Sequence, residues 1–135
     1  MTPWGVSVFV NLFYFLFQFL FLLNHHREAV NIWKNQVMPI YTERLGDHPF
    51  TATILNNSSN NYRDMEESAA AEEYAELALR IRRKLLADHR DTTKSLFDLG
   101  VALKANKKFT EAKDLLEQCK TMQEKVVNDS TLEEK

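Results

Sequence analysis

The sequence predicts an all-α fold of antiparallel helix pairs that repeat along the chain, preceded by an apolar N-terminal helix. Three observations support this prediction. The segment Leu45–Thr51 returns as Leu86–Thr92, which gives a period of 41 residues. Apolar residues recur at the 3.6-residue spacing of helices. Gly46 and Pro49 stand where one helix would end and the next begin. A period of roughly 20–50 residues indicates stacked supersecondary units rather than one closed core.

The first segment, residues 1–24, carries no charged side chain, and residues 6–23 hold six of the nine phenylalanines. Eighteen helical residues span about 27 Å, close to the roughly 30 Å of a bilayer core. We therefore expect a single membrane-spanning helix at residues 6–23. Arg27 and Lys34 follow it and no basic residue precedes it, which favours repeats on the cytoplasmic side.

The alternative for this segment is a soluble cytoplasmic chain. One period before residues 50–65 lie residues 9–24, so the segment can be a degenerate repeat helix packed on residues 28–45. Ser7, Asn11 and Gln18 would then lie along one stripe of that helix. The segment can also be unrelated sequence joined to the repeat by an error in the gene model. A cleaved signal peptide fits less well, because no basic residue precedes the apolar run and no small-residue cleavage site follows it.

Residues 25–127 are expected to hold about two and a half repeats. The second helix of one unit lies at 28–45, where Pro39 should kink or break it. Full units lie at 50–86 and 91–127, as the helix pairs 50–65 with 68–86 and 91–105 with 109–127. Leu96, Leu99 and Leu103 give the last pair an apolar face. Residues 128–135 form a polar tail.

The joints between units carry residues typical of helix ends. Gly46 can take the left-handed conformation that closes a helix, and Pro49 suits the first helical turn. Asp47 and Asp91 are expected to cap exposed backbone N–H groups. His48 and His89 occupy equivalent positions of the repeat, which indicates a structural role.

The run Leu96-Phe97-Asp98-Leu99-Gly100 resembles the tetratricopeptide pattern. Leu103, Phe109, Ala112, Leu116 and Cys119 continue that resemblance. The long period, the Gly46–Pro49 joint and the run Leu55-Asn56-Asn57 resemble the variant found in kinesin light chains and nephrocystin-3-like proteins. The resemblance covers residues 27–127. It implies a scaffold that binds a partner protein, with the first helices of successive units lining a concave groove for an extended peptide.

The resemblance also implies which residues line that groove. They are the polar and small side chains of the two first helices: Thr53, Asn57, Asn60, Asp64, Lys94, Asp98, Val101 and Ala105. Asn57, Asn60, Lys94 and Asp98 are the predicted binding residues. Asparagine amides both donate to and accept from a peptide backbone, and Lys94 can meet an acidic group. Because two first helices make a short groove, we expect micromolar or weaker binding.

The residue pattern favours no catalytic or metal centre. The chain has only three glycines and no phosphate-binding glycine loop. His25 and His26 lack a cysteine or carboxylate at ligand spacing, so we expect no cofactor, no metal and no enzymatic activity. Cys119, the only cysteine, is expected to be a small residue at a helix crossing. A net charge of −2 argues against a nucleic-acid ligand. The basic run Arg80, Arg82, Arg83 and Lys84 and the nearby glutamates are expected to be solvated.

Two further functional alternatives remain open. About three repeats are normally needed for a stable stack, so the chain can be a structural fragment or end cap of a larger array, completed by further tetratricopeptide repeats, with no binding activity of its own. A secreted or luminal protein is the other alternative, with Asn128 as a glycosylation acceptor in the polar tail.

Overall fold

A computed structural model describes residues 3–134, except the side chains of residues 3–7, 9, 10, 13, 21 and 26. The described chain consists of helices and connecting turns, with no strand in that range. This confirms the all-α helix-repeat fold. The chain divides after Gly46 into two compact units.

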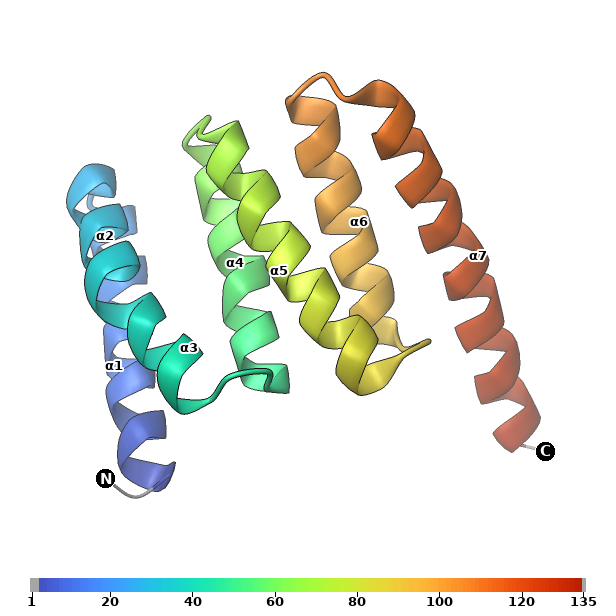
Figure 1. The fold of residues 1–135 in the computed structure, drawn as a ribbon, viewed down its shortest axis with the longest axis horizontal. Helices are drawn as coiled ribbons and strands as arrows, with labels where there is room; N and C mark the ends of the chain where they lie inside the picture. Colours follow the sequence, from blue (N-terminus) through green and yellow to red (C-terminus); the bar gives the residue numbers. More distant parts are fainter. Residues whose placement is uncertain (1–2, 135) are drawn as a thin grey trace. The chain divides into compact units, whose positions relative to one another are not determined.

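The first unit contains α1 (Pro3–Leu22), α2 (His26–Ile32), the π-helical turn η1 (Trp33–Val37) and α3 (Met38–Arg44). The last three follow one another as a single helical rod (Figure 1). The disturbance expected at Pro39 takes the form of this wider turn, which ends at Val37, two residues before the proline. Proline has no N–H to donate into the helix, and a π turn is one way to accommodate the missing bond.

The prediction of a membrane-spanning helix at residues 6–23, and with it the single-pass localisation, is wrong. No helix among the described residues is long and apolar enough to cross a bilayer. Helix α1 instead packs against α2 and η1. The Phe17 side chain is 1% exposed, and its ring centroid lies 5.1 Å from that of Trp33. Gln18 donates to the Tyr14 hydroxyl at 2.9 Å. Polar residues interrupt the apolar run, and one face of α1 is used for packing within the chain.

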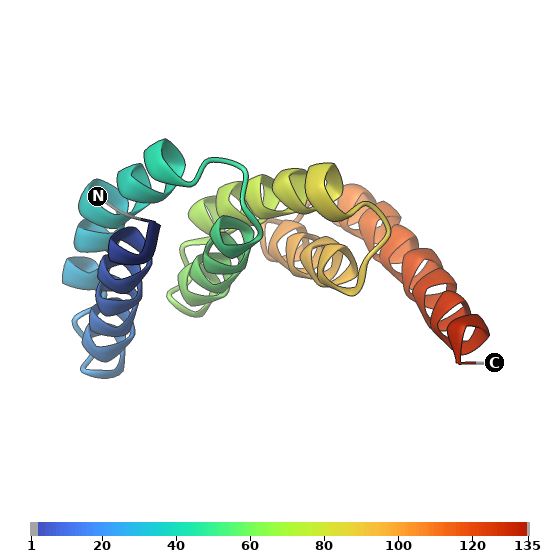
Figure 2. The same cartoon turned by 90° about the horizontal axis from the view of Figure 1, so that it is seen from below.

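The second unit consists of two antiparallel helix pairs, α4 (Pro49–Asp64) with α5 (Ser68–Leu86) and α6 (Arg90–Ala105) with α7 (Phe109–Glu133). Helix α5 contacts both α4 and α6, and the two first helices also contact each other (Figure 2). The core contains the predicted apolar face of α6, formed by Leu96, Leu99 and Leu103. Against it pack Ala75 and Leu79 of α5 and Ala112 and Cys119 of α7.

Helix α7 continues through most of the segment expected to be a polar tail. No glycine or proline ends the helix there, and the hydroxyls of Ser130 and Thr131 donate back to backbone carbonyls of the preceding turn. Asn128 therefore lies within a helix. The extra turns carry exposed Val127 and Leu132.

The N-terminal caps of α4 and α6 are supplied by histidines. His48 and His89 precede α4 and α6 with extended backbone, and each Nδ1 accepts from the N–H two residues on, at 3.0 and 3.1 Å. The structural role predicted for both histidines is thus confirmed. The capping role expected of Asp47 and Asp91 is wrong: Asp47 instead pairs with Lys84 at 2.7 Å, and Asp91 lies in the first turn of α6.

Replacing His89 with alanine should lower the free energy of unfolding by about 1 kcal/mol, because one N–H at the start of α6 loses its acceptor. The His89→Asn variant is the matched control, since its side-chain oxygen can accept the same bond. Urea denaturation of both variants measures the difference. Equal losses in the two variants would contradict the capping role.

The residues that end α3 and α5 have positive φ angles. Gly46 has φ +54°, whereas Ala87 at the equivalent position has φ 48° and ψ −123°. A Cβ makes this region costly, by about 1 kcal/mol or more. We expect Ala87→Gly to raise the free energy of unfolding by about 1 kcal/mol. Ala69→Gly, at an exposed helical position of α5, should lower it instead. Thermal melts of the two variants that shift in the same direction would contradict this assignment.

Candidate peptide-binding face

One side of α6 presents a stripe of accessible side chains. Lys94, Phe97, Val101 and Lys104 follow one another at spacings of three or four residues, so they share one face of the helix. Phe97 is 52% exposed, the two lysines are exposed and Val101 is half-buried. Leu96, Leu99 and Leu103 occupy another side of the helix and pack into the core. The stripe therefore faces away from the helices that hold α6 in place.

Helix α4 extends this surface with polar side chains. Thr53 and Asp64 are exposed, and Asn57 and Asn60 are half-buried. Asn60 is the equivalent of Val101 one period earlier, and Thr53 is the equivalent of Lys94. We call the stripe of α6 together with these four residues of α4 the first-helix face. It combines amides, a hydroxyl, two lysines and one exposed aromatic ring.

A chain of buried hydrogen bonds lies beneath the first-helix face. Asn56 donates from Nδ2 to Asp98 Oδ2 at 2.7 Å, and its Oδ1 accepts from Ser95 Oγ at 3.2 Å. Ser95 Oγ in turn accepts from Arg82 Nη1 at 2.9 Å. All four side chains are buried. The network connects α4, α5 and α6, so it fixes the two first helices relative to each other.

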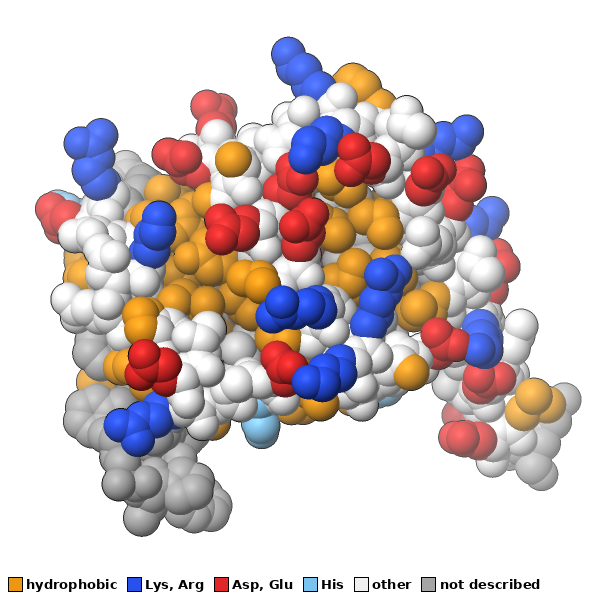
Figure 3. Space-filling model, viewed as in Figure 1, with side chains coloured by type: hydrophobic (Ala, Val, Ile, Leu, Met, Phe, Trp, Pro, Cys, Tyr) orange, Lys and Arg blue, Asp and Glu red, His pale blue; other side chains and the backbone are white. Residues whose placement is uncertain are grey.

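Arg82 anchors this network although it belongs to the basic run expected to be solvated. Its side chain is 3% exposed. It donates to the backbone carbonyl of Asp91 at 3.0 Å and to Thr53 Oγ1 at 3.3 Å, in addition to Ser95. The expectation of a solvated Arg82 is wrong. On the face shown in Figure 3, basic and acidic side chains are mixed over the surface.

Burial sets the electrostatics of the two charged groups in the network. Desolvation raises the pKa of Asp98 above its ordinary value, and nearby Lys94, Arg63 and Arg82 oppose that rise. Desolvation lowers the pKa of Arg82, and the charges of Asp91 and Asp98 oppose that fall. In each case burial is the larger effect, so the charged form of Asp98 is held at a cost to stability.

This cost predicts a pH-dependent effect of Asp98→Asn. Between the ordinary pKa of an aspartate and the raised pKa of folded Asp98, the folded state binds more protons than the unfolded state. The Asp98 contribution to stability therefore falls as the pH rises through that interval. Asparagine keeps an acceptor for Asn56 but cannot ionise. We expect the stability of Asp98→Asn relative to the original chain to increase from pH 4 to pH 7, measured by urea denaturation. A difference that stays constant or decreases would contradict the raised pKa.

The structure places the four predicted binding residues in different surroundings. Lys94 is exposed and Asn60 half-buried, both on the first-helix face, and Asn57 is half-buried at its edge. Asp98 is only 6% exposed and bonds to Asn56, so it supports the face from below. Phe97 was not predicted as a surface residue, and the network of Asn56, Ser95 and Arg82 was not predicted either. Helical spacing alone would have separated Phe97 from the buried leucines.

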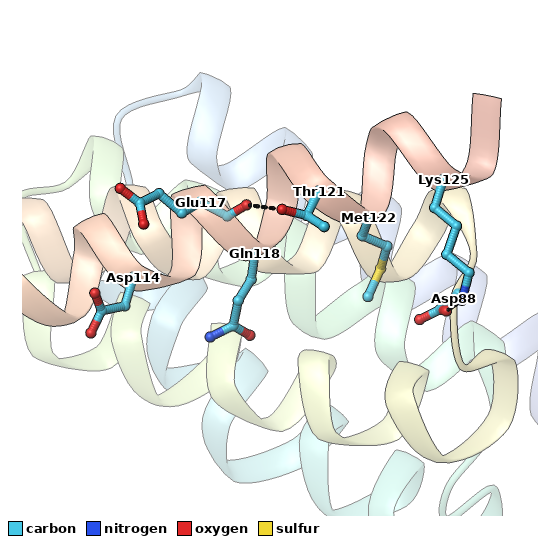
Figure 4. A pocket seen from close by; sticks show the side chains of 7 residues that line it. All are labelled: Asp88, Asp114, Glu117, Gln118, Thr121, Met122 and Lys125. Atoms are coloured by element: carbon cyan, nitrogen blue, oxygen red, sulfur yellow. Dashed lines mark hydrogen bonds and ion pairs between the residues drawn. The ribbon is translucent and has the colours of Figure 1, made fainter. Parts of the chain in front are cut away.

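A depression beside α7 and the buried cysteine are less suited to a peptide ligand. A surface depression beside α7 is lined by Asp88, Asp114, Glu117, Gln118, Thr121, Met122 and Lys125 (Figure 4). Its Lys125–Asp88 ion pair is the equivalent of Lys84–Asp47 one repeat earlier. Both ion pairs therefore belong to the loops that precede the first helix of a repeat. Cys119 is 6% exposed, and burial raises the pKa of its thiol. The described residues contain no cluster of metal-ligating side chains.

The fold defines a helical-repeat protein in which the first helices of successive pairs contact each other. The tetratricopeptide repeat family model matches residues 52–125, which is more than half of the chain, and the protein belongs to that family. Tetratricopeptide repeats are generally protein–protein interaction modules. A comparison with curated proteins found no match.

Proposed function

We propose that the second unit is a non-enzymatic scaffold that binds an extended segment of a partner protein along the first-helix face. The observation that carries the proposal is the stripe Lys94, Phe97, Val101 and Lys104 beside the amides of α4. A large exposed aromatic ring on a rigid helix is typical of a binding hot spot.

The chemistry of the face supports a peptide ligand in particular. The amides of Asn57 and Asn60 can donate to and accept from a peptide backbone. Lys94 and Lys104 flank Phe97 with positive charge, so an acidic side chain on either side of an apolar residue would be complementary. The buried network holds the face in one arrangement before binding, which lowers the ordering cost of binding. The surface is short, and we expect an affinity of micromolar or weaker.

The 41-residue period and the Gly46–Pro49 joint further support a place in the kinesin light chain and nephrocystin-3-like type of tetratricopeptide protein. That placement concerns the repeat type alone, because function resides in the binding surface rather than in the fold. The alternative is an end cap of a larger array, with no binding activity of its own. Leu116 and Met122 of α7 are only half-buried, and a further repeat packed on α7 would cover such residues, which favours the alternative. The experiment below separates the two functions.

The experiment begins with a phage-displayed library of random 15-residue peptides selected on the purified full chain. Fluorescence anisotropy then measures binding of an enriched peptide to variants. Phe97→Ala should weaken binding about tenfold or more, and Lys94→Ala and the double variant Asn57→Ala with Asn60→Ala should weaken it less. Leu132→Ala is the matched control, because Leu132 is 69% exposed and lies on α7, outside the first-helix face. Circular dichroism checks that each variant keeps its helix content.

Two results would contradict the proposal. In the first, selection on the full chain enriches no peptide more than selection on an unrelated helical protein does. In the second, the enriched peptides bind Phe97→Ala and Lys94→Ala as tightly as they bind the original chain. The first result would favour the end-cap alternative. The second would move the binding site away from the first-helix face.

A further inference from the structure

A second surface of this unit has the geometry of a helix-binding groove. It lies between the end of α6 and the first half of α7. Lys104, Phe109, Ala112, Lys113, Leu116 and Lys120 line it, with Glu117 as its single acidic side chain. Phe109 is 61% exposed and Leu116 half-buried. We call this surface the α6–α7 groove. It is distinct from the first-helix face, although Lys104 borders both.

The repeat shows what such a groove holds. One period earlier, the equivalents of Leu116 and Lys120 are Ala75 and Leu79 of α5. Those two residues are covered by Leu96, Leu99 and Leu103 of α6. The groove of the α4–α5 pair is therefore occupied by a helix with an apolar ridge at i, i+3 and i+7. The α6–α7 groove is the equivalent groove one repeat later. No helix among the described residues occupies it.

The two grooves carry opposite charges at the position that contacts the residues just after the bound helix. In the occupied groove, Glu72 pairs with Lys108 at 2.6 Å and also accepts from Asn106, just after α6 ends. Asn106 also donates to the carbonyl of Ser68 at 3.0 Å. The equivalent of Glu72 in the α6–α7 groove is Lys113. Lys120 replaces Leu79, which adds a second positive charge where the occupied groove is apolar.

We propose that the α6–α7 groove binds an amphipathic helix of a separate partner protein that carries acidic residues at its C-terminal end. The apolar ridge would cover Phe109 and Leu116, as α6 covers Ala75. An acidic residue just beyond the helix would pair with Lys113, reversing the Lys108–Glu72 contact. A second copy of this chain is a poor occupant: its own helix of suitable spacing, α6, is followed by Asn106, Lys107 and Lys108, which would face Lys113 with like charge.

The test uses two synthetic peptides and the full chain. The first peptide has the sequence of residues 90–108, and the second carries glutamate in place of Asn106, Lys107 and Lys108. Isothermal titration at low salt should show the acidic peptide binding about tenfold more tightly, because it exchanges repulsion between lysines for attraction to Lys113. Lys113→Glu should reverse the preference. Arg80→Glu, at an exposed position of α5 that belongs to neither surface, is the matched control and should leave the ratio unchanged.

Equal affinities, a preference that Lys113→Glu does not alter, or no binding of either peptide would overturn the proposal. Sedimentation equilibrium provides an independent check. A dimer of the full chain that Leu116→Glu disrupts would make a second copy the occupant and would also overturn it. Loss of peptide binding in Phe97→Ala bears on the proposed function alone, because Phe97 lies outside the α6–α7 groove.

Discussion

Replacing Arg82 with methionine is expected to lower the free energy of unfolding by about 3 kcal/mol, the largest loss we expect from a single substitution in this chain. Arg82 is 3% exposed and donates to three oxygens on α4 and α6. Methionine keeps much of the volume but none of the donors. The Asp91 carbonyl and the Ser95 hydroxyl would lose their donor, and buried Asp98 would lose a nearby positive charge.

The neighbouring Arg83 provides a matched control for this prediction. It is exposed and bonds only to exposed Gln118 among the described contacts, so Arg83→Met should cost less than about 1 kcal/mol. Urea denaturation of both variants at pH 7 gives the comparison. If Arg82→Met were as stable as Arg83→Met, Arg82 would not hold the network together in solution.

Substituting Gly100 with serine should lower the free energy of unfolding by about 2 kcal/mol. A Cβ at Gly100 would lie 2.8 Å from Leu116 Cδ2 and 2.9 Å from its Cγ, closer than carbon atoms pack. The contact involves the branched centre of Leu116 as well as its tip, so a small rotation does not relieve it. Helices α6 and α7 cross closely here because residue 100 has no side chain.

The preceding repeat shows how the same crossing accepts a serine. Its equivalents of Gly100 and Leu116 are Ser59 and Ala75, and Ser59 Oγ donates to the Ala71 carbonyl at 2.7 Å. Transplanting that pair as Gly100→Ser with Leu116→Ala should therefore cost at least about 1 kcal/mol less than the sum of the two single substitutions. Additive losses in this double-mutant cycle would show that the two residues do not compensate each other.

The helices of the second unit were predictable because their signals are local. Apolar spacing and the repeated joint placed α4, α5 and α6 within a residue or two of their observed ends. Helix α7 was predicted too short, because a polar segment without glycine or proline has no signal that ends a helix. The membrane prediction failed because it used only the length and the phenylalanine content of the first segment. Neither quantity indicates whether the helix packs within the chain, as α1 does where Phe17 contacts Trp33.

The candidate site was harder to predict because its support comes from distant residues. Lys94 and Asn60 were predicted from the resemblance to the tetratricopeptide pattern. The pairing of Asn56 with Asp98 joins residues 42 positions apart, and nothing local in the sequence indicates it. Arg82 looked solvated among other charges, yet it follows Ala78 by four residues and Leu79 by three, on the buried side of α5. Helical periodicity applied to each charged residue would have found it.

The central claim is that the first-helix face binds the partner segment. Nuclear magnetic resonance titration of the ¹⁵N-labelled full chain with a library-selected peptide tests it most directly. We expect the perturbed amides to cluster in residues 53–64 of α4 and 94–105 of α6, and we expect Phe97→Ala to remove the perturbation. Perturbations confined to α7, or to the first unit, would contradict it.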